Sequence, residues 1–258
     1  MLEALIILLA GVWAGTINTV VGSGTLITFP ILLLLGYPPI TANVSNNIGL
    51  VGGGISGAYG YRAEARAHRP LVLRLAPASV LGALTGAVLL LTLPADSFNT
   101  IVPVLISIGL LMVIIGPAMQ RRAAQRNLEL DRAESRSYES QIALIAGIYV
   151  LGIYGGYFGA AQGILLVGLM GILLPIGIQH INAVKNVLST IVNAVAAVVF
   201  MVIAWDRIDW KVVALIGSGS LLGGYLGARI GRRLSPLALR AVILVIGSLA
   251  LAKIQFFD

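Results

Sequence analysis

Polar side chains recur within an apolar stretch at residues 181–205. Their spacing of i, i+4, i+7 and i+11 places on one helix face Asn182, Asn186, Ser189 and Asn193. Lys185 borders this face, and a charge inside a bilayer costs roughly 3 kcal/mol unless it faces a cavity or an anion. We therefore expect Lys185 to bind an anion. The alternative is that Lys185, close to the start of its helix, extends its ammonium to the membrane interface.

A similar polar group occurs in the first half of the chain: Asn43, Ser45, Asn46 and Asn47. An asparagine amide offers two donors and an acceptor without a charge, which suits an oxyanion that must bind and then leave. The alternative for each asparagine is a structural hydrogen bond between helices. The matching placement of the two groups favours a shared binding site.

Two interrupted apolar helices supply further candidate groups. The first break is Gly22-Ser23-Gly24-Thr25, and the second, about 140 residues later, is Gly159-Ala160-Ala161-Gln162-Gly163. Paired breaks in two halves of a membrane protein indicate a transporter's substrate site, because lipid cannot satisfy the freed backbone groups. We expect Ser23 and Thr25 to cap a short helix at 25–36, and Gln162 to be placed similarly before 163–175. Such helix N-termini favour anions.

The predicted substrate-binding set therefore combines the breaks with the polar faces: Gly22, Ser23, Gly24, Thr25, Asn43, Asn46, Asn47, Gln162, Gly163, Asn182, Lys185, Asn186 and Ser189.

The scarcity of residue types that bind metals or carry out catalysis restricts the possible functions further. The chain has no cysteine and only two histidines, His68 and His180. All carboxylates fall at termini, in loops or close to helix ends, so no acidic proton relay or sodium site is expected at the membrane centre. No catalytic set or metal cluster stands out. We expect a protein that is not an enzyme and needs no metal or cofactor.

Composition assigns the chain to the membrane. Hydrophobic residues make up 58% and charged residues 10%, against about 25% charged in a soluble domain. The apolar runs are long and continuous, which predicts helices rather than a barrel. The expected fold is an all-α polytopic protein of the cell (inner) membrane with about eight to ten membrane segments. The net charge of +7 lies mainly in loops, where it sets orientation, so no nucleic-acid partner is implied.

The two halves align at an offset near 140 residues, which predicts a first membrane repeat at 1–118, a cytoplasmic linker at 119–140 and a second repeat at 141–258. Basic loops at 62–74 and 120–141 mark the cytoplasmic side. In the second half the basic cluster moves by one connection, to Arg229, Arg232 and Arg233. This displacement predicts inverted repeats. It requires each broken helix pair to return to its own side as a hairpin, with both termini outside the cytoplasm.

Several motifs resemble one family of permeases. They are Gly22-Ser23-Gly24-Thr25-Leu26-Ile27-Thr28-Phe29-Pro30, Gly36-Tyr37-Pro38-Pro39, Thr41-Ala42-Asn43, Gly57-Ala58-Tyr59-Gly60-Tyr61-Arg62, Tyr154-Gly155-Gly156-Tyr157-Phe158-Gly159-Ala160 and Asn182-Ala183-Val184-Lys185-Asn186. Together they resemble the TauE/SafE family of sulfite and organosulfonate exporters over nearly the whole chain. The resemblance implies a small polytopic permease for sulfur-containing anions such as sulfite or organosulfonates.

The residues and the resemblance together predict a membrane transporter that binds its anion at the midplane between two repeats. The alternatives are an anion channel, or a transporter of another small organic anion. The expected partners are a small inorganic or organic sulfur-containing anion and membrane lipid. The sequence is also compatible with a homodimer.

Overall fold

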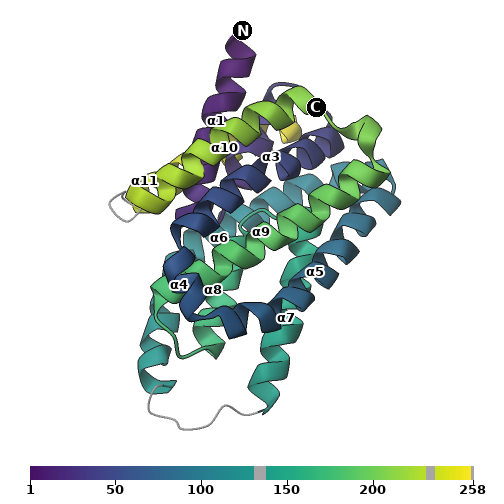
Figure 1. Cartoon of the computed structure of the whole chain (residues 1–258). Helices are drawn as coiled ribbons and strands as arrows, with labels where there is room; N and C mark the ends of the chain where they lie inside the picture. The colour runs from purple at the N-terminus through teal and green to yellow at the C-terminus, as the bar shows by residue number, and fades with distance from the viewer. Residues whose placement is uncertain (131–137, 231–235, 257–258) are drawn as a thin grey trace.

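All secondary structure is helical among the residues described by the computed structural model, which are 1–130, 138–230 and 236–256 (Figure 1). Helices account for 89% of these residues and no strand occurs among them. The helices are α1 Leu2–Val20, α2 Thr25–Leu34, α3 Pro39–Gly60, α4 Arg62–Ala67, α5 Arg69–Thr92, α6 Ala95–Leu130, α7 Tyr138–Tyr157, α8 Gln162–Leu173, α9 Ile178–Ile203, the 3₁₀ turn η1 Trp205–Arg207, α10 Trp210–Ile230 and α11 Pro236–Phe256.

Within the described ranges, seven helices are long and apolar enough to cross a membrane: α1, α5, part of α6, α7, α9, α10 and α11. The 10-residue α2 and the 12-residue α8 are too short to span it alone. The expected polytopic helical architecture is therefore confirmed. The predicted short segments 25–36 and 163–175 correspond to these two short helices.

Each short helix folds back on the long helix before it. Tyr37 follows α2, and its hydroxyl donates to Glu3 Oε1 at 2.6 Å, near the start of α1. In the second half Leu173, at the end of α8, lines one pocket together with Gln141, near the start of α7. Both pairs are hairpins whose short arm returns towards the end from which the long arm began.

Glycines allow very close helix contacts, and each of these contacts joins a helix of one half to a helix of the other half. A Cβ atom on Gly86 of α5 would lie 2.0 Å from the carbonyl oxygen of Ile153 on α7. Likewise, a Cβ on Gly223 of α10 would lie 2.0 Å from the carbonyl oxygen of Val12 on α1. Small residues at such positions let helix backbones touch. The short helices also pack on the other half, α2 on α11 and α8 on α6.

The basic stretches gather at one end of the molecule. Arg74 donates to Gln141 at 2.5 Å, which joins the 62–74 stretch to the start of α7. Gly60 packs against Ala228, which brings the end of α10 to the end of α3. Of the predicted linker 119–140, residues 119–130 continue α6, residues 131–137 lie outside the described residues, and α7 begins at Tyr138. Arg232 and Arg233 also lie outside them.

Candidate functional site

The two helix breaks meet in the buried interior of the protein. The Gly163 N–H donates to the Gly22 carbonyl oxygen at 3.0 Å, so the tips of the two hairpins touch. Gly22 has a φ of 90°, which favours glycine. A Cβ on Gly163 would lie 2.5 Å from the Gly22 Cα, so no side chain fits between the tips. The two breaks, which the sequence analysis placed in one substrate-binding set, therefore lie in direct contact.

Lys185 is placed directly beside these tips and is 0% exposed. Its Nζ donates to the carbonyl oxygens of Asn18 and Thr19, both at 3.1 Å, and Asn186 Nδ2 donates to Thr19 at 3.4 Å. These carbonyls belong to the last turn of α1, where a helix leaves acceptors unpaired and carries a partial negative charge. The alternative of an ammonium at the membrane interface is therefore wrong. No carboxylate is among the described partners of Lys185.

Asn43 caps the end of α7, the other long arm, as Lys185 caps the end of α1. Asn43 Nδ2, from α3, donates to the carbonyl oxygen of Tyr157 at the end of α7, at 2.9 Å. Asn46 accepts a hydrogen bond from the hydroxyl of Thr28 on α2. The structural reading, a hydrogen bond between helices, therefore holds for Asn43 and Asn46. Each broken arm is thus capped by a helix of the opposite half, with a cation at α1 and a neutral amide at α7.

The expected side-chain caps of the short helices are absent. Gly24 is the N-cap of α2 and Ala161 that of α8, and neither cap has a side-chain hydrogen bond. The Ser23 hydroxyl is buried and has no hydrogen-bond partner among the described residues. Gln162 instead turns back onto its own hairpin, where Nε2 donates to the Leu151 carbonyl at 2.9 Å. The cap prediction failed because glycine and alanine turns already begin these helices.

The remaining predicted residues extend from the tips along α3 and α9. Ser189 lies one turn after Lys185, is 8% exposed, and its Oγ has no partner among the described residues. Asn47 Nδ2 donates to Asn193 Oδ1 at 3.4 Å, across the contact between α3 and α9. Asn182 is half-buried one turn before Asn186, and no described hydrogen bond joins it to the breaks.

Two residues outside the predicted substrate-binding set also shape the site. Asn18 contributes its carbonyl to Lys185, and its Oδ1 accepts from the Gly24 N–H at 3.5 Å. The Tyr154 hydroxyl donates to the Ala160 carbonyl at 2.5 Å and so ties the second break to α7. The signal available for Asn18 was its position in the last turn before a break, where carbonyl groups need donors.

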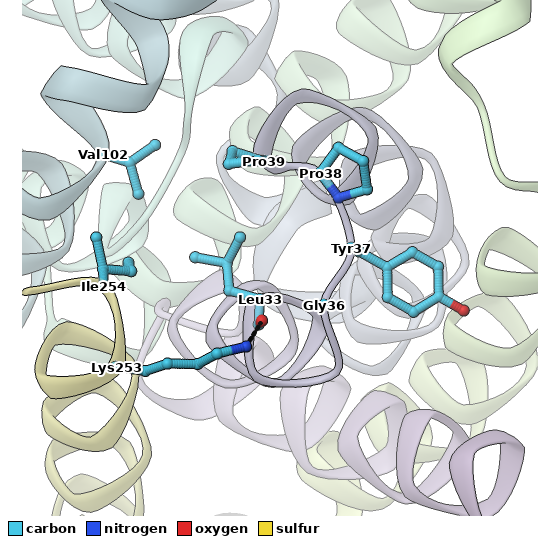
Figure 2. Close-up of a pocket in the computed structure, with 8 residues that line it drawn as sticks. All are labelled: Leu33, Gly36, Tyr37, Pro38, Pro39, Val102, Lys253 and Ile254. Atoms are coloured by element: carbon cyan, nitrogen blue, oxygen red, sulfur yellow. Dashed lines mark hydrogen bonds between the residues drawn. The ribbon is translucent and has the colours of Figure 1, made fainter. Parts of the chain in front are cut away.

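A pocket of about 380 Å³ lies at the open end of the first hairpin, one length of α2, or roughly 15 Å, from the break. Figure 2 shows Lys253 of α11 reaching the Leu33 carbonyl at the end of α2, a bond of 2.9 Å. On the same loop, burial and the hydrogen bond to Glu3 raise the pKa of Tyr37, so its hydroxyl stays a donor. Lys253 thus caps α2 as Lys185 caps α1, but away from the breaks.

Comparison with known proteins identifies the family. The sequence model described as Sulfite exporter TauE/SafE matches residues 7–254. The chain belongs to the TauE/SafE family. A relative from Escherichia coli (strain K12), named "Probable membrane transporter protein YfcA", is 30% identical over 94% of this chain and 86% of its own length.

More distant TauE/SafE relatives agree. A "Probable membrane transporter protein" from Haemophilus influenzae is 26% identical over 97% of this chain and 94% of its own length. "Probable membrane transporter protein ORF9" from Sinorhizobium sp is 28% identical over 93% and 87%. The chain is therefore a multi-pass membrane transporter of the cell membrane.

Proposed function

We propose that this transporter carries a small oxyanion, bound where the hairpin tips meet Lys185. The buried ammonium of Lys185 carries this proposal. An ammonium has three N–H donors, of which two are used by Asn18 and Thr19. Since its described partners are neutral carbonyls, the charge lacks a counter-ion, and an uncompensated charge is costly in a membrane interior. A small anion on the third N–H would compensate it.

The backbone around the tips supports the same ligand class. The short helices α2 and α8 begin at the breaks, so their positive dipole ends lie there. No described hydrogen bond uses the backbone N–H groups of Ser23 or Thr25, and the Ser23 hydroxyl is also unpaired. These donors would complete the shell of an oxyanion without a second fixed charge, so that the anion could leave.

The proposed substrate is a sulfur-containing anion such as sulfite or a short organosulfonate. The family description and the motifs quoted above support this choice. A tetrahedral or pyramidal oxyanion presents three oxygens to three separate donors, which fits the third Lys185 N–H and the free groups at the first break. Another small organic anion remains the alternative substrate.

The hairpins support inverted repeats that enter from opposite sides and meet tip to tip. The start of α1 and the start of α7 lie at opposite ends of the molecule in Figure 1, and the long helices pack on helices of the other half. The chain has no cysteine, so single cysteines can report topology directly. We expect Leu2→Cys in intact cells to react with a membrane-impermeant maleimide, and Glu139→Cys to react only after lysis. Equal labelling of both in intact cells would overturn the orientation.

Flux in proteoliposomes tests the function. Liposomes containing the purified protein and loaded with unlabelled sulfite should take up radiolabelled sulfite, or a labelled short sulfonate, by exchange that saturates with concentration. Exchange without net current supports a carrier, whereas ohmic anion current in planar bilayers would favour the channel alternative. Uptake no faster than in protein-free liposomes, with and without a pH gradient, would overturn the proposed substrates.

A further inference from the structure

Helix α9 carries a row of polar side chains that begins at the hairpin tips. Lys185, Ser189 and Asn193 follow each other at i, i+4 and i+8, so they share one side of the helix at about 6 Å intervals. Asn47 of α3 joins this row through its hydrogen bond of 3.4 Å to Asn193. The amide of Asn47 therefore lies about one helical turn from Ser189.

Two groups in this row are buried and unused. Ser189 Oγ and Asn47 Oδ1 belong to side chains that are each 8% exposed, and neither atom has a partner among the described residues. Buried polar atoms without partners are uncommon and call for an explanation. The Oδ1 atom of the neighbouring Asn46 does accept a hydrogen bond, from the Thr28 hydroxyl, so free amide oxygens are not a general property of α3.

The chemistry of the two atoms specifies a ligand group. An amide oxygen only accepts hydrogen bonds, whereas a serine hydroxyl both donates and accepts. A fully deprotonated oxyanion only accepts, so it would leave Asn47 Oδ1 unpaired. The row can be satisfied by a ligand that presents its charge to Lys185 and a donor, such as a hydroxyl or ammonium group, about 6 Å further along α9.

We propose that Ser189 and Asn47 form a neutral subsite that selects anions carrying a hydrogen-bond donor a few atoms from their charged group. This inference rests on the proposed function, because it requires that Lys185 hold the charged end of the substrate. It makes those small oxyanions that carry a second, uncharged or cationic, polar end the preferred substrates.

Two isosteric probes test the subsite by calorimetric titration of the purified protein: 3-hydroxypropane-1-sulfonate and butane-1-sulfonate, which differ by a hydroxyl in place of a methyl group. Wild-type protein should prefer the hydroxylated probe by about tenfold or more, because the analogue leaves a buried acceptor unpaired. Ser189→Ala and Asn47→Leu should each reduce this preference, by lowering the affinity for the hydroxylated probe more than the affinity for butane-1-sulfonate.

Thr190→Ala is the matched control. Thr190 follows Ser189, but its hydroxyl is already bonded to the Asn186 carbonyl at 2.6 Å, so the preference should persist in this variant. Equal wild-type affinity for the two probes, or a preference that survives both Ser189→Ala and Asn47→Leu, would overturn the subsite. Failure of wild-type protein to bind either probe would instead overturn the proposed sulfonate-binding function. The affinities of the wild-type protein for the two probes test the subsite even if a variant does not fold.

Discussion

Substituting Gly163 by alanine tests the contact between the hairpin tips. The new Cβ would lie 2.5 Å from Gly22 Cα, 2.9 Å from the Gly22 oxygen and 3.0 Å from Lys185 Cδ. Ordinary contacts begin near 3.4 Å, so the backbones must separate by roughly 1 Å, which is the scale of an overpacked core. The Gly163–Gly22 hydrogen bond, 3.0 Å long, would stretch with them.

We expect the free energy of unfolding of Gly163→Ala to fall by about 2–4 kcal/mol. Overpacking accounts for about 1–3 kcal/mol of this, and the weakened hydrogen bond for about 1 kcal/mol. Thermal unfolding in detergent, followed by intrinsic fluorescence, measures the loss as a lower Tm. Exchange flux should fall as well, because Lys185 and its donors would move apart.

Gly217→Ala is the matched control for this experiment. Gly217 lies inside α10, and a Cβ there would meet only the Gly49 carbonyl oxygen at 3.8 Å, an ordinary contact. Because alanine favours helix more than glycine does, this variant should be as stable as wild type or more so. If Gly163→Ala matched Gly217→Ala in Tm and in flux, the direct contact between the tips would be refuted.

Two further predictions follow from the packing and from the histidines. Gly86→Ala should lower the Tm sharply, because its Cβ would lie 2.0 Å from the Ile153 oxygen; an unchanged Tm would contradict the close packing of α5 on α7. Burial, and then the neighbouring His180, whose ring centroid is 4.5 Å away, lower the pKa of His68. The unfolded chain therefore binds a proton at His68 more readily than the folded chain does, so stability should fall as pH drops below about 6.5. His68→Gln should reduce this dependence in Tm measured between pH 8 and 5; an identical pH profile in both proteins would exclude His68 as its source.

The lengths of the apolar runs and the positions of the glycines that interrupt them predicted much of the fold. The long apolar runs correspond to helices with ends within a few residues, apart from α6, which continues beyond 118 to Leu130. The breaks were predictable because Gly22 and Gly159, with φ of 90° and 76°, adopt conformations that favour glycine. That each pair forms a hairpin was a condition of the inverted-repeat hypothesis, which the displaced basic loop favoured.

The hydrogen-bond partners of the site residues could not be predicted from the sequence. Helical spacing gives the face on which Lys185 lies, but its contact with Asn18 joins residues 167 positions apart and depends on how the two halves of the chain pack together. Gln162 satisfied the spacing expected of a cap, yet its flexible side chain found an acceptor at Leu151 on its own hairpin. Spacing along one helix specifies neither the rotamer nor the acceptor that tertiary packing brings near.

Two lysines that cap helix ends allow the central claim to be tested. Lys185 and Lys253 each donate to two backbone carbonyls, the first beside the breaks and the second at the end of α2. Methionine keeps much of the shape of either side chain and removes its charge. The decisive measurement is therefore sulfite exchange by Lys185→Met and Lys253→Met, normalised to the amount of folded protein in the liposomes. Loss of a charged hydrogen bond to the anion should reduce flux in Lys185→Met by roughly 10- to 100-fold while Lys253→Met stays near wild type. Wild-type flux in folded Lys185→Met, or an equal loss in both variants, would show that Lys185 only caps a helix.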